Sequence, residues 1–157
     1  MHKSVLLNES IDGLNIKECG VYIDATVGYA GHSSKILEKI KKRGFLFAFD
    51  QDDEALKYSE KLLSSISDNF KLIHDNFKNM NEYITEPVDG ILFDLGVSSP
   101  EIDNSDRGFS YKLDSELDMR MNKDNELTAK EIVDNYSEEK LVKILFTYGE
   151  EKYARSI

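Results

Sequence analysis

Cysteine, basic residues and long apolar runs are all scarce in this chain. Its one cysteine, Cys19, cannot form an internal disulfide, which fits a reducing compartment and leads us to expect a cytoplasmic protein. The longest apolar runs, such as residues 45–49, are far too short to cross a bilayer. Residues 1–9 are interrupted by polar side chains and carry no cleavage-site pattern, so a signal peptide is not expected. The sequence therefore predicts no membrane association.

Positive charge is also in short supply, because 20 lysines and arginines accompany 30 aspartates and glutamates, for a formal net charge of −10. This balance argues against a broad nucleic-acid surface, since phosphate contacts come from Lys and Arg. A local basic cluster at residues 39–43 is also explained as a solvated helix end. The length of 157 residues, with 40% hydrophobic and 32% charged residues, is typical of one soluble globular domain, or of one domain with part of another.

A loop that contains glycines follows the first apolar strand, expected over residues 21–26, and precedes a helical pattern. The loop and the helix start read Gly28-Tyr29-Ala30-Gly31-His32-Ser33. Small side chains let a ligand approach the main chain, and a helix start offers unpaired N–H donors. The spacing differs from the Gly-x-Gly-x-x-Gly dinucleotide fingerprint at Ala30 and Ser33, which disfavours a nicotinamide dehydrogenase. Asp24 would repel a pyrophosphate but suits the cationic S-adenosylmethionine. The loop therefore indicates an S-adenosylmethionine site, with an ordinary strand-to-helix turn as the alternative.

Strands and helices alternate along the N-terminal part of the chain. Further strands are expected over residues 45–50, 70–74 and 88–94, with a helix that ends at Gly44 and another that begins at Asp52. This alternation predicts a parallel, doubly wound α/β sheet with helices on both faces. Three of the strands end in an acid, and these acids are Asp24, Asp50 and Asp94. We expect them at one edge of the sheet, where such folds bind ligands, although each acid alone is also explained as a cap or turn residue.

The pattern changes after Pro100. Residues 103–118 predict a long ordered loop or crossing segment. A capping box of Thr128 and Glu131 predicts the start of one helix, and Ser137 predicts the cap of another that ends at Gly149.

Several strings of residues resemble those of one bacterial enzyme family. They occupy residues 24–33, 49–52, 74–77, 89–100, 107–110, 117–121 and 148–151. The most specific is Asp94-Leu95-Gly96-Val97-Ser98-Ser99-Pro100. The chain thereby resembles the RsmH (MraW) family, whose members use S-adenosylmethionine to methylate N4 of a cytosine in the decoding region of 16S ribosomal RNA. The resemblance covers residues 2–155, and it implies that the chain corresponds to the N-terminal half of a family member.

The resemblance implies a partial Rossmann-like class I methyltransferase sheet followed by the start of an inserted helical domain. The S-adenosylmethionine-binding methyltransferase core would occupy residues 1–105, and the start of an α-helical substrate-recognition domain would occupy residues 106–157. The implied partner is 16S ribosomal RNA within a small-subunit particle, and a second copy of the chain in a homodimer is a further expectation. No cysteine motif or histidine pair suggests a metal site.

The resemblance also implies roles for individual residues. Ala30, Gly31 and His32 would hold the amino-acid end of the cofactor through the backbone, Asp50 would bind the ribose hydroxyls, Phe77 would lie against the adenine ring, and Asp94 would line the pocket near the methyl donor. Glu101 would be a further cofactor residue, although it stands where the family usually has Gln, just as Ala30 stands where it usually has Gly.

Simpler roles for the same residues remain open. His32 could be a polar residue at a helix start, and Phe77 could be an ordinary core aromatic. Arg107 and Arg120 are normally surface or salt-bridged groups, whereas the family suggests contacts with a flipped base or a phosphate.

Methyl transfer to cytosine N4 chiefly requires that the amine be aligned with the S–CH₃ bond. A carboxylate that accepts the N–H as positive charge develops would stabilise the transition state, and we assign this role to Asp94 as a hypothesis. Two alternatives stay open: a methyltransferase that acts on another amine, and an inactive fragment that only binds cofactor or RNA.

Overall fold

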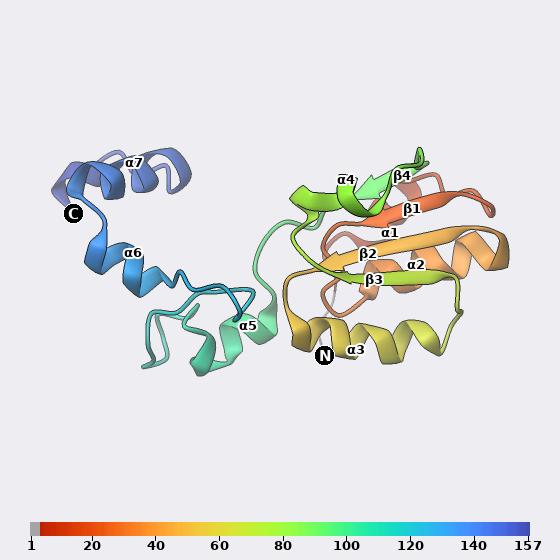
Figure 1. Ribbon diagram of the computed structural model, residues 1–157, viewed down its shortest axis with the longest axis horizontal. Coiled ribbons are helices and arrows are strands. Elements are labelled where there is room, and N and C mark those ends of the chain that lie inside the picture. Colours follow the sequence, from red (N-terminus) through yellow and green to blue (C-terminus); the bar gives the residue numbers. More distant parts are fainter. Residues whose placement is uncertain (1–3) are drawn as a thin grey trace. The chain divides into compact units, whose positions relative to one another are not determined.

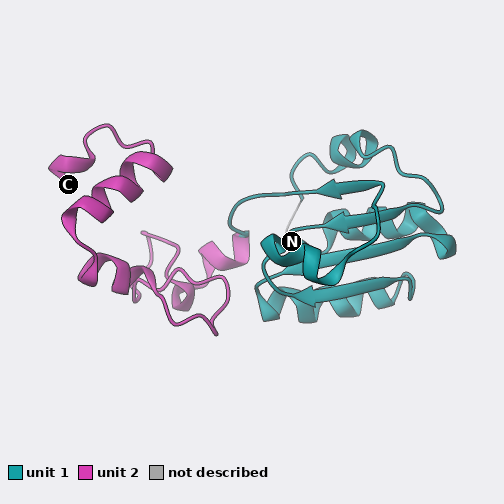
Figure 2. Ribbon diagram, turned by 45° about the horizontal axis from the view of Figure 1, so that its top comes forward, with its two compact units in different colours: residues 1–98 teal, residues 99–157 magenta. Residues whose placement is uncertain are grey.

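The computed structural model describes residues 4–157 and divides the chain after Ser98 into two compact units (Figure 2). The first unit contains a sheet with helices around it, and the second consists of helices and loops. Within the described range, no helix combines the length and the apolar character that crossing a membrane would require. The expected start of an inserted domain at residue 106 stays a prediction.

A four-stranded parallel sheet forms the centre of the first unit (Figure 1). Its strands are β1 (Val21–Asp24), β2 (Phe45–Asp50), β3 (Phe70–His74) and β4 (Gly90–Leu92). They lie in the order β3-β2-β1-β4, so the chain winds outward from β1 in both directions. The expected α/β, doubly wound, partial Rossmann-like sheet is confirmed. The order reverses between β1 and β4, and ligands of such sheets bind at this switch point, beyond the carboxyl ends of the strands.

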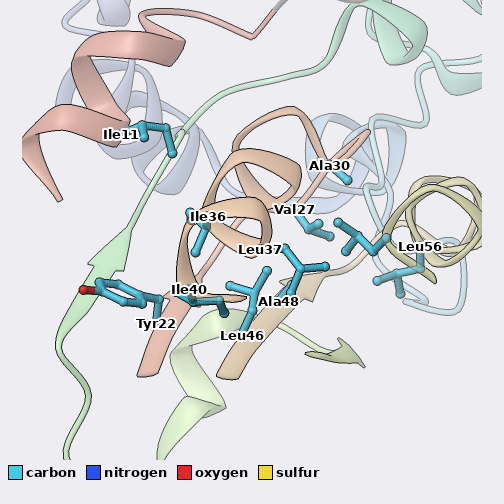
Figure 3. Packing of buried hydrophobic residues seen from close by; sticks show 11 residues of the cluster. Ile11, Tyr22, Val27, Ala30, Ile36, Leu37, Ile40, Leu46, Ala48 and Leu56 are labelled. Atoms are coloured by element: carbon cyan, nitrogen blue, oxygen red, sulfur yellow. The ribbon is translucent and has the colours of Figure 1, made fainter. Parts of the chain in front are cut away.

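Helices cover both faces of the sheet. They are α1 (Leu7–Gly13), α2 (Gly31–Ile40), α3 (Asp53–Ser64) and α4 (Met80–Tyr83), with short 3-10 turns η1 (Lys41–Arg43) and η2 (Phe77–Asn79). On one face, Leu46 and Ala48 of β2 pack with Ile36, Leu37 and Ile40 of α2 (Figure 3). Successive strand residues point to opposite faces, so Phe49 belongs to a second cluster, against which residues of η2 and α4 pack.

One predicted helix end is wrong, and one helix was not predicted. Helix α2 ends at Ile40 rather than at Gly44, because Lys41 adopts a positive φ of 53° and a 3-10 turn follows. Gly44 is instead extended, and its lack of a side chain serves packing, since a Cβ there would lie 2.5 Å from the Gly20 carbonyl oxygen. Helix α1 was not expected, because its seven residues bury only Ile11 and leave a weak apolar pattern.

The second unit holds α5 (Ser99–Asp103), η3 (Ser105–Arg107), α6 (Ala129–Asn135), α7 (Glu138–Tyr148) and η4 (Ala154–Ser156). The predicted cap of α6 is confirmed, because Thr128 Oγ1 accepts a hydrogen bond from the Glu131 N–H at 3.1 Å. Ser137 lies at the N-cap of α7 as expected, but its side chain makes no capping hydrogen bond. Neither α6 nor α7 contains a fully buried residue.

Candidate functional site

The loop between β1 and α2 bends through two residues in the left-handed region, Gly28 with φ 48° and Ala30 with φ 60°. An alanine adopts this region at a cost of about 1–2 kcal/mol, so a methyl group at position 30 is compatible with the turn. The side chain of Ala30 is completely buried at the N-cap of α2. A Cβ at Gly28 would meet nothing closer than the Thr26 carbonyl oxygen at 4.0 Å, which leaves space for a ligand against the backbone.

Asp50 fastens this loop to the end of β2. Its Oδ2 accepts a hydrogen bond from the Gly28 N–H at 2.8 Å, and its Oδ1 accepts one from the Asp52 N–H at 3.0 Å. Burial raises the pKa of Asp50, and these backbone hydrogen bonds oppose that rise. A carboxylate has about four acceptor positions, so beside the backbone hydrogen bonds from Gly28, Asp52 and Gln51 the group retains capacity for a hydroxyl donor. The predicted contact with ribose hydroxyls is chemically compatible with this arrangement.

Asp24 lies beneath the loop rather than on its solvent side. Its carboxylate is completely buried, and it accepts hydrogen bonds from Ser33 Oγ at 2.7 Å and from the Thr26 N–H at 3.1 Å. Burial is the main cause that raises its pKa. The expectation that Asp24 presents its charge directly to a cationic ligand is wrong, because no atom of this side chain reaches the surface. Asp24 instead ties the end of β1 to the start of α2.

Asp94 and His32 meet beside the loop. The backbone N–H of Asp94 donates to Thr26 Oγ1 at 2.8 Å, which places the segment after β4 against the segment after β1. Asp94 Oδ2 lies 3.7 Å from His32 Nδ1, and the carboxylate keeps 42% of its side chain exposed. The ring of His32 is almost completely buried, and its Nε2 lies 3.2 Å from the carbonyl oxygen of Val5. A substrate can therefore reach the carboxylate, whereas the imidazole behind it is shielded.

Phe77 begins η2, just beyond the end of β3. Its ring meets Phe93 edge to face, with ring centres 5.3 Å apart and planes at 81°. Asp75 braces this turn by accepting hydrogen bonds from the Asn76 N–H at 2.7 Å and from Tyr83 Oη at 2.9 Å. The side chain of Asn79, which donates to the same carboxylate, is the main cause that lowers the pKa of Asp75, and the bonds from Tyr83 and the Asn76 N–H add to it. The aromatic pair is at the carboxyl edge of the sheet, and the predicted stacking of Phe77 on adenine stays a prediction.

Glu101 belongs to the second unit, where it is buried in α5. Its Oε1 lies 3.6 Å from Arg107 Nη2, which also donates to the carbonyl oxygens of Arg120 at 3.2 Å and Met121 at 3.0 Å. Arg120 forms an ion pair with Asp118 at 2.7 Å, and this pairing lowers the pKa of Asp118 to about 2. Within this unit both arginines have the structural partners that the simpler interpretation expected.

Three hydroxyl residues that the sequence reasoning missed hold the site together. Ser59 of α3 is completely buried and donates to the Gly28 carbonyl oxygen at 2.6 Å, while Thr26 and Ser33 bind the backbone of Asp94 and the side chain of Asp24. One signal was available for Ser59, because it lies four residues from both Ala55 and Leu63 on the buried face of α3. A polar residue in such a stripe indicates a specific buried hydrogen bond.

Over residues 4–157, no group of three side chains of His, Cys, Asp or Glu is arranged to hold a metal ion. The candidate site is therefore built from backbone N–H groups, carboxylates, one imidazole and an aromatic pair. Such a set can bind hydroxyls and a cationic or aromatic ligand, and it can accept a proton.

Comparison with known proteins gives consistent matches. The model of the MraW methylase family matches residues 1–157. The ribosomal RNA small subunit methyltransferase H of Mycoplasma mycoides subsp. mycoides is 51% identical over 160 residues, which cover 99% of this chain and 52% of that protein. The protein of the same name from Mesoplasma florum is 53% identical over 161 residues, with the same coverage of 99% and 52%. The chain thus spans about half the length of these curated relatives.

A solved structure from Clostridium thermocellum, provisionally described as an rRNA methylase, is similar with a TM-score of 0.56 and 30% identity. The similarity covers 62% of this chain and 54% of that one. This likeness agrees with the partial Rossmann-like sheet.

Proposed function

The chain belongs to the MraW methylase family, and from that membership we propose that its protein transfers a methyl group from S-adenosylmethionine to N4 of a cytosine in the decoding region of 16S ribosomal RNA. The names of the relatives support ribosomal RNA of the small subunit as the substrate. The observation that carries the proposal within this chain is the placement of the half-exposed Asp94 carboxylate beside the loop after β1.

The cofactor site is proposed at the carboxyl edge of the sheet. Bound S-adenosylmethionine supplies an electrophilic methyl group. The backbone of Ala30, Gly31 and His32 would hold its amino-acid end, Asp50 would accept the ribose hydroxyls, and Phe77 would contact the adenine ring. The open space over Gly28 and the remaining acceptor capacity of Asp50 support this assignment. Glu101, which belongs to the second unit, is proposed as a further cofactor residue.

Asp94 is proposed to accept the hydrogen of the attacking amine. The lone pair of cytosine N4 is delocalised into the ring, so nitrogen gains positive charge as the new bond forms. A carboxylate that is placed in advance stabilises this charge without reorganisation of solvent. The backbone N–H of Asp94 donates a hydrogen bond to Thr26 Oγ1, which fixes the backbone of Asp94 beside the loop after β1. This fixed backbone supports the proposed role of the carboxylate.

The test replaces Asp94 by Asn in the protein as its gene encodes it. We expect kcat to fall about 100-fold or more, because proton acceptance contributes on the order of 10²–10⁴. Calorimetry should show cofactor binding within about threefold of the wild type, since the amide conserves the shape of the side chain. Asp53→Asn is the matched control, because it removes an exposed carboxylate on α3 and should leave both quantities unchanged. Intact turnover with unchanged binding in Asp94→Asn would contradict the assignment.

The substrate is tested by mass spectrometry of nucleosides from small-subunit RNA, with and without the gene. Loss of N4-methylcytidine is expected, and an unchanged level would favour another amine substrate. A fragment that only binds cofactor would give saturable heat with S-adenosylmethionine but no methyl transfer. We propose the assembled small-subunit particle as the acceptor, because a net charge of −10 leaves few cations for naked RNA.

A further inference from the structure

His32 lies between two hydrogen-bond acceptors that come from different parts of the first unit. Its Nε2 is 3.2 Å from the Val5 carbonyl oxygen, and its Nδ1 is 3.7 Å from Asp94 Oδ2. A carbonyl oxygen only accepts, so the bond to Val5 requires the proton on Nε2. In the neutral ring, Nδ1 then carries a lone pair that faces the Asp94 carboxylate. His32 Nδ1 and Asp94 Oδ2 therefore face each other as two acceptors, with no proton between them.

We propose that the side chain of His32 is a proton-relay residue, which takes up through Asp94 the proton released by the methylated amine. This inference rests on the proposed function and adds to it a catalytic role for the imidazole, whereas the resemblance implied that this residue holds the cofactor mainly through its backbone. The distance of 3.7 Å is longer than a hydrogen bond. Distances between catalytic groups are often long before substrate binds and shorten in the reactive complex.

The lone pair of cytosine N4 forms the new N–C bond, and the S–CH₃ bond breaks with its electron pair staying on sulfur. The amine proton moves to an oxygen of Asp94, and the O–H then donates to His32 Nδ1. The resulting imidazolium has a donor for each neighbour, Nε2–H for Val5 and Nδ1–H for Asp94. After product leaves, the proton returns to water through the half-exposed carboxylate.

Two carboxylates and one carbonyl oxygen face the ring. Asp94 approaches from the segment after β4, and Asp24 at the end of β1 interacts electrostatically with His32. Val5 contributes the neutral carbonyl oxygen. The ring is shielded from solvent, so these acidic groups act on it with little screening.

The first test uses His32→Gln, because a glutamine amide can still donate to the Val5 carbonyl oxygen but cannot take up a proton. We expect kcat to fall about 10- to 100-fold, with cofactor affinity within about twofold of the wild type. The pH profile of kcat should differ between the wild type and His32→Gln at acidic pH, because only the wild type has a second proton acceptor behind Asp94. A purely structural role would not alter the profile.

His74→Gln is the matched control, since the Nε2 of this exposed histidine also contacts a backbone carbonyl oxygen, that of Gln51 at 3.0 Å. It should leave kcat and its pH profile unchanged. The double variant His32→Gln/Asp94→Asn should be no slower than Asp94→Asn alone, because the two residues act in series.

Nitrogen-15 NMR of the wild-type ring gives a readout independent of activity. The free protein at the pH of the assay should carry its proton on Nε2, with Nδ1 unprotonated. A proton on Nδ1 in the free protein, alone or together with one on Nε2, would overturn the relay, and so would a His32→Gln variant with the kcat and pH profile of the wild type. If the wild type itself transfers no methyl group to small-subunit particles, the proposed function fails, and the relay fails with it.

Discussion

Single polar side chains hold the loop after β1 in its bent conformation. Ser59 binds the carbonyl oxygen of Gly28, Asp50 binds its N–H, and Asp24 binds Ser33 from below. The bonds made by Asp50 and Ser59 join residues 22 and 31 positions apart, and the bond between Asp24 and Ser33 joins residues 9 apart. Replacement of one partner would leave a buried polar atom unpaired, which costs about 1–3 kcal/mol. The loop is therefore rigid because its backbone is tied from three sides.

Asp24 makes stability depend on pH in a direction opposite to that of most carboxylates. Its pKa in the folded state is raised above the ordinary value of 3.8, so between these two values the folded state binds more protons than the unfolded state. Stability from this group is complete below pH 3.8 and is lost as the pH rises through the folded pKa. We expect the free energy of unfolding of the wild type, minus that of Asp24→Asn, to fall as the pH rises. Urea unfolding across this range measures the difference.

Asp75→Asn provides a control of opposite sign. Hydrogen bonds lower the pKa of Asp75 in the folded state, so its contribution is present above the ordinary value and is lost as the pH falls through the folded pKa. The same difference in unfolding free energy should therefore rise with pH for this variant. A flat difference for Asp24→Asn would show that its carboxylate is not desolvated.

Helix starts differ in how much their cap residue contributes. Thr128 and Ser137 occupy equivalent positions before α6 and α7, but only Thr128 accepts a capping hydrogen bond from the backbone. We expect Thr128→Ala to lower the free energy of unfolding by about 1 kcal/mol, and Ser137→Ala to lower it by only a few tenths. Urea titrations followed by far-ultraviolet circular dichroism compare the two. Equal effects would mean that the cap geometry does not control these short helices.

The sheet of the first unit presents one strand edge at β4, which pairs on one side with β1. Ile91 in this strand and Phe93 just beyond it are 39% and 48% exposed. Unpaired N–H and C=O groups beside apolar side chains form a template for another strand. The homodimer that the sequence led us to expect stays a prediction, and this edge is the contact that we predict for it.

We predict that the 157-residue chain associates through β4 at high concentration. Analytical ultracentrifugation should give an average mass that rises with concentration for the wild type. Ile91→Lys should keep the mass at that of the monomer, because a charge at the edge opposes pairing. Tyr111→Lys, at a residue that is 94% exposed in the second unit, should associate like the wild type. Equal association of all three would place the contact elsewhere.

Local patterns in the sequence predicted the first and last residues of some elements correctly. Strands β2 and β3 have the predicted bounds, because a buried strand reads as a short apolar run between turn residues. Asp52 and Thr128 cap helices as predicted, since capping depends on residues only two or three positions away. The doubly wound order and the edge that gathers Asp50 and Asp94 also followed from alternation, because right-handed crossovers allow few other arrangements.

Only the tertiary structure decided what each polar group does. Asp24 is buried by segments that pack over it. The bond from Ser59 to Gly28 and the approach of His32 to Asp94 join residues that are far apart in the chain. The sequence around such a polar residue looks the same whether its side chain faces solvent or the interior. Sequence spacing therefore cannot distinguish an exposed polar side chain from a buried one. Packing settled the question, because a polar atom in the core must find a partner there, and that partner depends on which distant segment lies against it.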